Sequence, residues 1–258
     1  MFKRKILSKL EAWKQDERHK PLILRGARQV GKTTVVNEFG SQFDNYLYFN
    51  LEISESVRLF EMDIPLNDLV NMLFASLGKS QKEGSTLIFI DEIQNSPKTI
   101  ALLRYFYEQR PDLYVIAAGS LLENLVDVNV SFPVGRVMYL ALRPCSFYEF
   151  LGAIGKNNLL TILSQKAEYS IAFHEQLMHQ FNQYTIIGGM PEAVQHYAET
   201  QDIIAIEDVY ETLVQAYKDD SEKYARSNKL TDVVRFILSY GWAFSGETIT
   251  LGNFSNSG

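Results

Sequence analysis

The sequence predicts an α/β fold, a parallel five-stranded sheet with helices on both faces, followed by an all-helical region. Three observations support this prediction. Short apolar runs rich in β-branched and aromatic residues alternate with segments of helical periodicity. Each run is almost continuously apolar, which is typical of strands covered on both faces of a parallel sheet. After Pro144 the strand pattern stops, and helical patterns with short breaks take its place.

The predicted elements follow in order along the chain. An amphipathic helix comes first, because large apolar residues recur at helical spacing from Phe2 to Trp13. Strands are expected at residues 22–24, 46–52, 86–90, 114–118 and 137–142. Helices are expected from near Lys32, at residues 66–77 and at about residues 98–109. The later helical patterns lie at residues 146–154, 172–184, 191–199, 204–220 and 229–244.

These elements suggest a chain of four parts. Residues 1–19 form the N-terminal amphipathic helix, and residues 20–144 form the α/β core. Residues 145–224 form a helical region. The last part, residues 225–258, ends on loop-type residues, so we expect it to be the start of a further folded segment that is cut short.

The composition is typical of a globular protein. The chain has 258 residues, of which 46% are apolar, so it can bury a sizeable core. Its single cysteine, Cys145, excludes an internal disulfide framework and a zinc site made of cysteine pairs. The N-terminus has no apolar run of the length that a signal peptide or a membrane span requires. We therefore expect a cytoplasmic protein that does not contact a membrane.

Charge is distributed unevenly along the chain. The net charge is -6, yet residues 1–36 carry ten lysines or arginines against three acidic residues. Such a basic region is expected where a polyphosphate or nucleic acid binds, although a solvated basic helix would have the same composition. The four histidines are scattered without ligand spacing, so we expect no metal site other than one for magnesium.

A phosphate-binding loop is predicted at residues 26–34, GARQVGKTT, which has the spacing G-x-x-x-x-G-K-T between a predicted strand and a predicted helix. Gly26 and Gly31 permit backbone conformations in which successive N–H groups point at phosphate oxygens. The start of the helix adds unpaired N–H groups and the positive end of its dipole. We expect Lys32 to reach the β- and γ-phosphates and the Thr33 hydroxyl to ligate Mg²⁺. The expected nucleotide contacts are Gly26, Gln29, Val30, Gly31, Lys32, Thr33 and Thr34.

An acidic pair ends the third predicted strand, in the sequence LIFIDEIQ. Asp91 and Glu92 fall at the C-terminal end of a buried strand, where open α/β sheets bind ligands. We expect Asp91 to hold hydrated Mg²⁺ and Glu92 to be the catalytic base that polarises the attacking water. Capping of the following helix is the alternative role. GTP-binding proteins ordinarily carry an Asn-Lys-x-Asp motif, and NKLT at residues 228–231 lacks its Asp, which favours ATP.

Two further positions are catalytic candidates with open alternatives. Ser120 follows the fourth predicted strand and could orient the attacking water or bind the γ-phosphate, or it could cap a helix. Arg136 follows a Pro-Gly turn and could cover transition-state charge, within the chain or on a neighbouring subunit, or be a surface residue. Arg28 and Arg143 are candidates of the same kind. We expect GGMPEAV, at residues 188–194, to be structural.

Together these motifs resemble those of a bacterial and archaeal family of P-loop ATPases of the AAA+ type. The matching strings are GARQVGKTT, IFIDEIQ, AAGSLL, GRVMYLALRPCSFYEFL and GGMPEAV, in that order. The resemblance implies a P-loop NTPase core with an additional strand between the phosphate-loop strand and the acidic strand. It also implies the usual roles for Lys32, Thr33, Asp91 and Glu92, a polar sensor at Ser120, and an arginine sensor or finger at Arg136.

The resemblance extends to the C-terminal region. Members of this family usually continue into a winged-helix-like segment and a further, nuclease-like domain. Residues 229–258 look like the beginning of the winged part. The portion that would determine the partner is then expected to be missing, which leaves a DNA or protein partner open.

From these features we expect a Mg²⁺-dependent ATPase that acts as a nucleotide-driven switch, with ATP and Mg²⁺ as its ligands. The alternative is a nucleic-acid-binding regulator controlled by ATP, which the basic N-terminal region and the winged-helix resemblance would support. A small-molecule kinase is disfavoured, because Glu92 is better placed to activate water than to bind an acceptor. Assembly into a homo-oligomer stays open.

Overall fold

The computed structural model describes residues 2–119, 133, 135–165, 171–224 and 228–241. The chain divides into two compact units, residues 1–194 and residues 195–258. The first unit therefore holds the N-terminal helix, the α/β core and the helices up to residue 194, which the sequence analysis placed in three separate parts. Within the described ranges, no helix is both long and apolar enough to cross a membrane.

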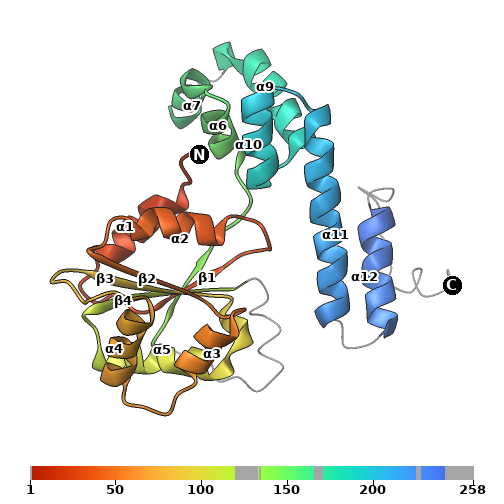
Figure 1. Ribbon diagram of the computed structural model, residues 1–258. Helices are drawn as coiled ribbons and strands as arrows, with labels where there is room; N and C mark the ends of the chain where they lie inside the picture. Colours follow the sequence, from red (N-terminus) through yellow and green to blue (C-terminus); the bar gives the residue numbers. More distant parts are fainter. Residues whose placement is uncertain (1, 120–132, 134, 166–170, 225–227, 242–258) are drawn as a thin grey trace. The chain divides into compact units, whose positions relative to one another are not determined.

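The first unit is built on the expected five-stranded parallel sheet (Figure 1). The strands are β1 (Leu22–Arg25), β2 (Asn45–Asn50), β3 (Thr86–Asp91), β4 (Leu113–Gly119) and β5 (Met138–Ala141). Their order across the sheet is β2-β3-β4-β1-β5, and all neighbouring strands are parallel. β4 therefore lies between β1 and β3, which is the additional strand that the family resemblance implied.

Alternate side chains of the strands enter two cores, one on each face of the sheet. In β3, Ile88 and Ile90 belong to one core. Leu87 and Phe89, the residues between them, belong to the other. This burial on both faces explains why the strands read as continuous apolar runs. One face is covered by α3 (Ser54–Phe60), α4 (Leu66–Ser76) and α5 (Pro97–Gln109), and the other by α1 (Ile6–Lys14) and α2 (Lys32–Gly40) (Figure 1).

A helical segment follows β5 within the same unit. It contains α6 (Phe147–Ala153), α7 (Asn157–Ser164), α9 (His174–Ile187) and the start of α10 (Pro191–Thr200). Leu151, Leu159 and Leu177 form a small core between α6, α7 and α9. Two helices, α3 and α7, were not expected from the sequence.

The second unit is helical where it is described. It contains η3 (Ile204–Ile206), α11 (Glu207–Tyr224) and α12 (Asn228–Tyr240). The predicted winged-helix-like segment begins at α12, but residues 242–258 lie outside the described residues. The winged-helix form of this segment therefore stays a prediction.

Candidate nucleotide-binding site

The loop between β1 and α2 has the backbone shape that its two glycines predict. Gly31, the N-cap of α2, has a left-handed backbone conformation with a φ of 87°. A Cβ atom on Gly26 would lie 2.4 Å from the carbonyl oxygen of Leu142, so the chain passes too close to the residue after β5 for a side chain at this position. The side chain of Val30 is fully buried in the core under α1 and α2 and anchors the loop between the glycines. The chain thus turns tightly into α2, whose first N–H groups have no partner within the helix.

Lys32 places a positive charge on this loop. Its side chain is buried, and its Nζ atom donates hydrogen bonds to the carbonyl oxygens of Gly26 and Ala27, both at 2.9 Å. Burial lowers the pKa of Lys32, while the nearby carboxylates of Glu92 and Asp91 oppose that shift. The Lys32 ammonium group therefore lies close to the two acidic side chains.

Asp91 joins the end of β3 to the phosphate loop. The Thr33 hydroxyl donates a hydrogen bond of 2.6 Å to the Asp91 carboxylate. Burial raises the pKa of Asp91, and the hydrogen bonds from Thr33 and from the backbone N–H of Glu92 partly offset this effect. The structure thus brings the two predicted magnesium ligands into direct contact.

Glu92 follows Asp91 and, like Asp91, lies near the Lys32 ammonium group. It has a positive φ of 53°, which is uncommon for a residue with a side chain. The Gln94 amide nitrogen, on the short helix η1 (Ile93–Asn95), donates a hydrogen bond to the Glu92 carboxylate. Burial raises the pKa of Glu92, although the bond from Gln94 acts in the opposite direction. Glu92 is therefore a partly buried carboxylate whose affinity for a proton is increased.

Thr33 and Asp91 fit a magnesium ion by their chemistry. Both present oxygen atoms, which hard divalent cations prefer. Across the residues that the structure describes, no cluster of three or more His, Cys, Asp or Glu side chains could hold a metal by itself. A site with one hydroxyl and one carboxylate agrees with the preference of Mg²⁺ for few protein ligands beside water and phosphate oxygens.

Two further predicted nucleotide contacts, Gln29 and Thr34, lie in the loop and at the start of α2. Gln29 has a positive φ of 61° and is exposed, and Thr34 is exposed on the first turn of α2. Arg28 is also exposed and lies near enough to Lys32 to lower the pKa of that lysine. Arg143 has an exposed side chain after β5, and its backbone carbonyl accepts a hydrogen bond from Arg4.

The structure does not bring Arg136 to this site within one chain. Arg136 precedes β5, where Met138 pairs with Leu22, the first residue of β1. The phosphate loop instead follows the last residue of β1, at the opposite end of the parallel strands. The Arg136 side chain pairs with Glu108 of α5. Ser120, the other predicted catalytic candidate, lies outside the described residues.

The GGMPEAV motif has the structural role expected of it. The backbone N–H of Cys145 donates a hydrogen bond of 2.6 Å to the Gly189 carbonyl. A Cβ atom on Gly189 would lie 2.5 Å from the Cys145 carbonyl oxygen, so this close approach requires glycine. Burial raises the pKa of the Cys145 thiol to about 11, which keeps it neutral at physiological pH.

The strand order and the phosphate loop define a P-loop NTPase fold. The chain belongs to the AAA domain family, whose model matches residues 18–151, just over half of the chain. A second family model, a domain of unknown function, DUF8612, matches residues 178–254. The family assignment agrees with the expected AAA+ type of core followed by a C-terminal region of unknown function.

The comparisons with solved structures and with curated proteins give no information on function. A solved chain from "Structure of Drosophila ORC bound to DNA" is similar at a TM-score of 0.42 and 15% identity, over 94% of this chain and 67% of that chain. At this level of likeness we infer neither a function nor a partner from it. No curated protein matches the sequence.

Gln94 and Arg4 are among the residues that contact the site and were not predicted from the sequence. Gln94 stands two positions after Glu92, and a polar side chain so close to an acidic pair was a signal that could have been used. Arg4 contacts the loop at Val30 from 26 residues away in sequence. It is one of several basic residues near the N-terminus, and no spacing distinguishes it from the others.

Proposed function

We propose that the protein binds Mg-ATP on the phosphate loop and hydrolyses it, and that it acts as a nucleotide-driven switch. The observation that carries the proposal is the 2.6 Å hydrogen bond between the Thr33 hydroxyl and the Asp91 carboxylate. It joins the phosphate loop to the acidic strand end, although β4 separates the two strands. Lys32 and Glu92 lie beside this pair, so the groups that phosphoryl transfer to water requires are together.

Each residue has a distinct role in this proposal. The amides of the loop and the Lys32 ammonium bind the β- and γ-phosphates and orient them. Thr33 and Asp91 hold Mg²⁺, which would neutralise charge on the phosphate oxygens when bound. Glu92 accepts the proton of the water whose oxygen attacks the γ-phosphorus, the bond to the bridging oxygen breaks, and ADP and inorganic phosphate leave.

The substitution Glu92→Gln tests the proposed base. It removes the proton acceptor and keeps the side-chain volume, so we expect phosphate release to fall by roughly 10² to 10⁴-fold. Binding of Mg-ATP, measured by titration calorimetry, should persist because the loop is intact. Glu83→Gln, at an exposed position after α4, is the matched control and should hydrolyse ATP at the parent rate. Equal, nonzero rates for the parent and Glu92→Gln would exclude Glu92 as the base.

Control of nucleic-acid binding by ATP is the alternative, and the structure offers it less support. Its two arguments were the basic N-terminal region and the winged-helix resemblance. Arg4 and Lys32 of that region are buried and contact other parts of the chain. DNA binding that appears at low salt and depends on ATP would favour the alternative.

A cytoplasmic location remains part of our proposal.

A further inference from the structure

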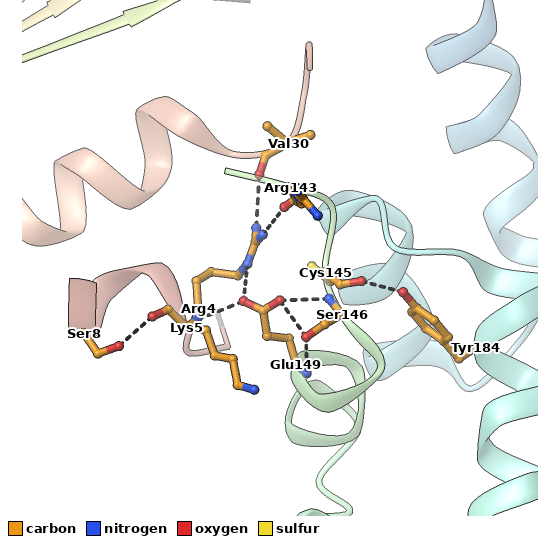
Figure 2. A network of polar contacts seen from close by, with 9 residues as sticks. All are labelled: Arg4, Lys5, Ser8, Val30, Arg143, Cys145, Ser146, Glu149 and Tyr184. Carbon is orange, nitrogen blue, oxygen red and sulfur yellow. Dashed lines mark hydrogen bonds and ion pairs between the residues drawn. The ribbon is translucent and has the colours of Figure 1, made fainter. Parts of the chain in front are cut away.

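A buried arginine outside the predicted site, Arg4, donates a hydrogen bond to the backbone of the phosphate loop. Arg4 lies just before α1, and only 6% of its side chain is exposed. Its Nη1 atom donates a hydrogen bond of 3.0 Å to the carbonyl oxygen of Val30, in the middle of the loop. Its Nη2 atom donates one of 2.7 Å to the Arg143 carbonyl, and its Nε atom one of 3.0 Å to the Glu149 carboxylate (Figure 2). One guanidinium group thus joins the N-terminal segment to the phosphate loop and to residues 143–149, which are far apart from both in sequence.

Glu149, the partner of Arg4, is itself held by several donors. Its carboxylate accepts hydrogen bonds from the backbone N–H of Lys5 at 2.9 Å and from that of Ser146 at 2.8 Å (Figure 2). Burial alone would raise the pKa of Glu149, but these N–H groups and Arg4 outweigh it and keep the pKa below its usual range. Glu149 also completes the capping box at the start of α6 with Ser146. The ion pair is therefore built into the N-terminus of the first helix after the sheet.

The GGMPEAV turn packs on the same side of the loop. A Cβ atom on Gly31 would lie 3.7 Å from Nη1 of Arg4 and 3.8 Å from Cγ of Pro191. Met190, the preceding residue, packs against the core under α1 and α2. The back of the loop is therefore covered by Arg4 and by the turn before α10, which leaves the opposite side for a ligand.

The planarity of the peptide bond gives this contact a consequence for binding. In a trans peptide the carbonyl oxygen and the following N–H point in opposite directions. Because Arg4 holds the Val30 carbonyl on the back of the loop, the N–H of Gly31 is directed to the other side. In a phosphate loop that N–H is one of the groups that must face the phosphate oxygens.

We propose that Arg4 is a positioning residue for the phosphate loop, and that the Arg4–Glu149 pair couples phosphate binding to the docking of residues 143–149. The coupling follows because the same guanidinium orients the Val30 peptide and holds the segment that leads into α6. If phosphate binding favours the ordered loop, it also favours this docking, and the reverse holds by linkage. This inference rests on the nucleotide binding proposed above.

The substitution Arg4→Lys separates positioning from charge. An ammonium group keeps the positive charge near Glu149, but it lacks the planar fork that reaches a carboxylate and two carbonyl oxygens at once. Arg110→Lys is the matched control, because Arg110 also makes a forked contact, with Asp112, at the opposite end of β4 from the site. Amide hydrogen exchange of residues 26–34 in the nucleotide-free protein measures the order of the loop directly. ADP affinity and steady-state ATP hydrolysis measure how the substitution affects nucleotide binding and turnover.

We expect faster exchange of the loop and a roughly tenfold weaker ADP affinity in Arg4→Lys, with neither change in Arg110→Lys. The KM for ATP should rise while kcat changes little, because the loop holds phosphates equally before and during the reaction. In the parent, ADP should also slow exchange in residues 143–153, and Arg4→Lys should lose this effect. Parent-like loop exchange and ADP affinity in Arg4→Lys would overturn the proposal.

A second variant covers the case in which Arg4→Lys does not fold. Glu149→Gln keeps the size of the side chain and leaves both carbonyl contacts of Arg4 in place, but removes the charge that holds the guanidinium. We expect the same changes at smaller amplitude, and a loop with parent-like exchange in this variant would contradict the proposal. If the parent protein binds no nucleotide, the proposed function fails, whereas loop exchange in the nucleotide-free variants still tests the role of Arg4.

Discussion

Glu92 shows how a single backbone conformation shapes the site. Its φ of 53° and ψ of 44° are left-handed, and for a residue with a side chain this conformation costs on the order of 1 kcal/mol. The strain is maintained because β3 is fully buried up to Asp91 and η1 begins immediately after Glu92. The Glu92 carboxylate then accepts a hydrogen bond from the Gln94 amide. Strained residues of this kind are concentrated at functional sites.

The pH dependence of hydrolysis should report the raised pKa of Glu92. Burial raises that pKa, and a base must be deprotonated, so activity falls as the pH drops through the raised value. The pH at which kcat falls to half on the acid limb should therefore lie above about 4.3, the ordinary pKa of glutamate. Gln94→Ala removes a donor that lowers the pKa, so the limb should move to higher pH. Gln15→Ala, at an exposed position after α1, should leave it unchanged. A limb that stays in place or moves to lower pH in Gln94→Ala would contradict this assignment.

At the scale of elements, the phosphate loop depends on how closely β5 approaches the end of β1. The backbone N–H of Leu142 donates a hydrogen bond of 2.7 Å to the Arg25 carbonyl, just before the loop. Gly26 then passes the Leu142 carbonyl so closely that a Cβ atom would overlap it. The loop is thus positioned by the strand that precedes it and by its neighbour in the sheet.

The substitution Gly26→Ala should displace the loop. Because the added methyl group meets backbone rather than a flexible side chain, we expect a loss of about 1–3 kcal/mol in the free energy of unfolding. Affinity for ADP should fall at least roughly tenfold at temperatures where the variant is folded. Gly152→Ala, within α6 and facing only a side-chain atom of Leu160 at 3.3 Å, is the control and should be near neutral. Denaturant titration and calorimetry measure the two effects, and unchanged ADP affinity in folded Gly26→Ala would show that the loop tolerates a side chain.

On the scale of the whole molecule, the sheet order decides which groups meet. Parallel strands place all their C-terminal ends at one edge, so the loop after β1 and the acidic pair after β3 share that edge. Arg136 lies at the other edge, where it and Arg104 both contact Glu108. An arginine there can serve a nucleotide only on a neighbouring molecule.

Assembly with ATP would reveal such a role for Arg136. If Arg136 acts on a neighbour, light scattering should show a larger species when ATP is added, and phosphate release per molecule should rise with protein concentration. Arg136→Ala should remove the concentration dependence. Arg104→Ala is the matched control, because it removes the other arginine that contacts Glu108. A monomer at all concentrations with undiminished hydrolysis in Arg136→Ala would exclude the role.

The sequence alone predicted the parallel sheet, the phosphate loop and the acidic pair. Strand bounds agree with the structure to within two residues, as at β1, where residues 22–24 were expected and Leu22–Arg25 is found. These features are local: an apolar run, a spacing of glycines and a dipeptide after a strand each depend on neighbouring residues. The short helices α3 and α7 were not predicted.

Only the tertiary structure decided which distant residues meet. The contact of Thr33 with Asp91 spans 58 residues, and that of Arg4 with Glu149 spans 145. The sequence gives the types of these residues, but their pairing follows from the order of the strands and from burial. A buried charge requires a partner. The fold alone determines that Arg4 pairs with Glu149, at the start of α6, while it also contacts the phosphate loop at Val30.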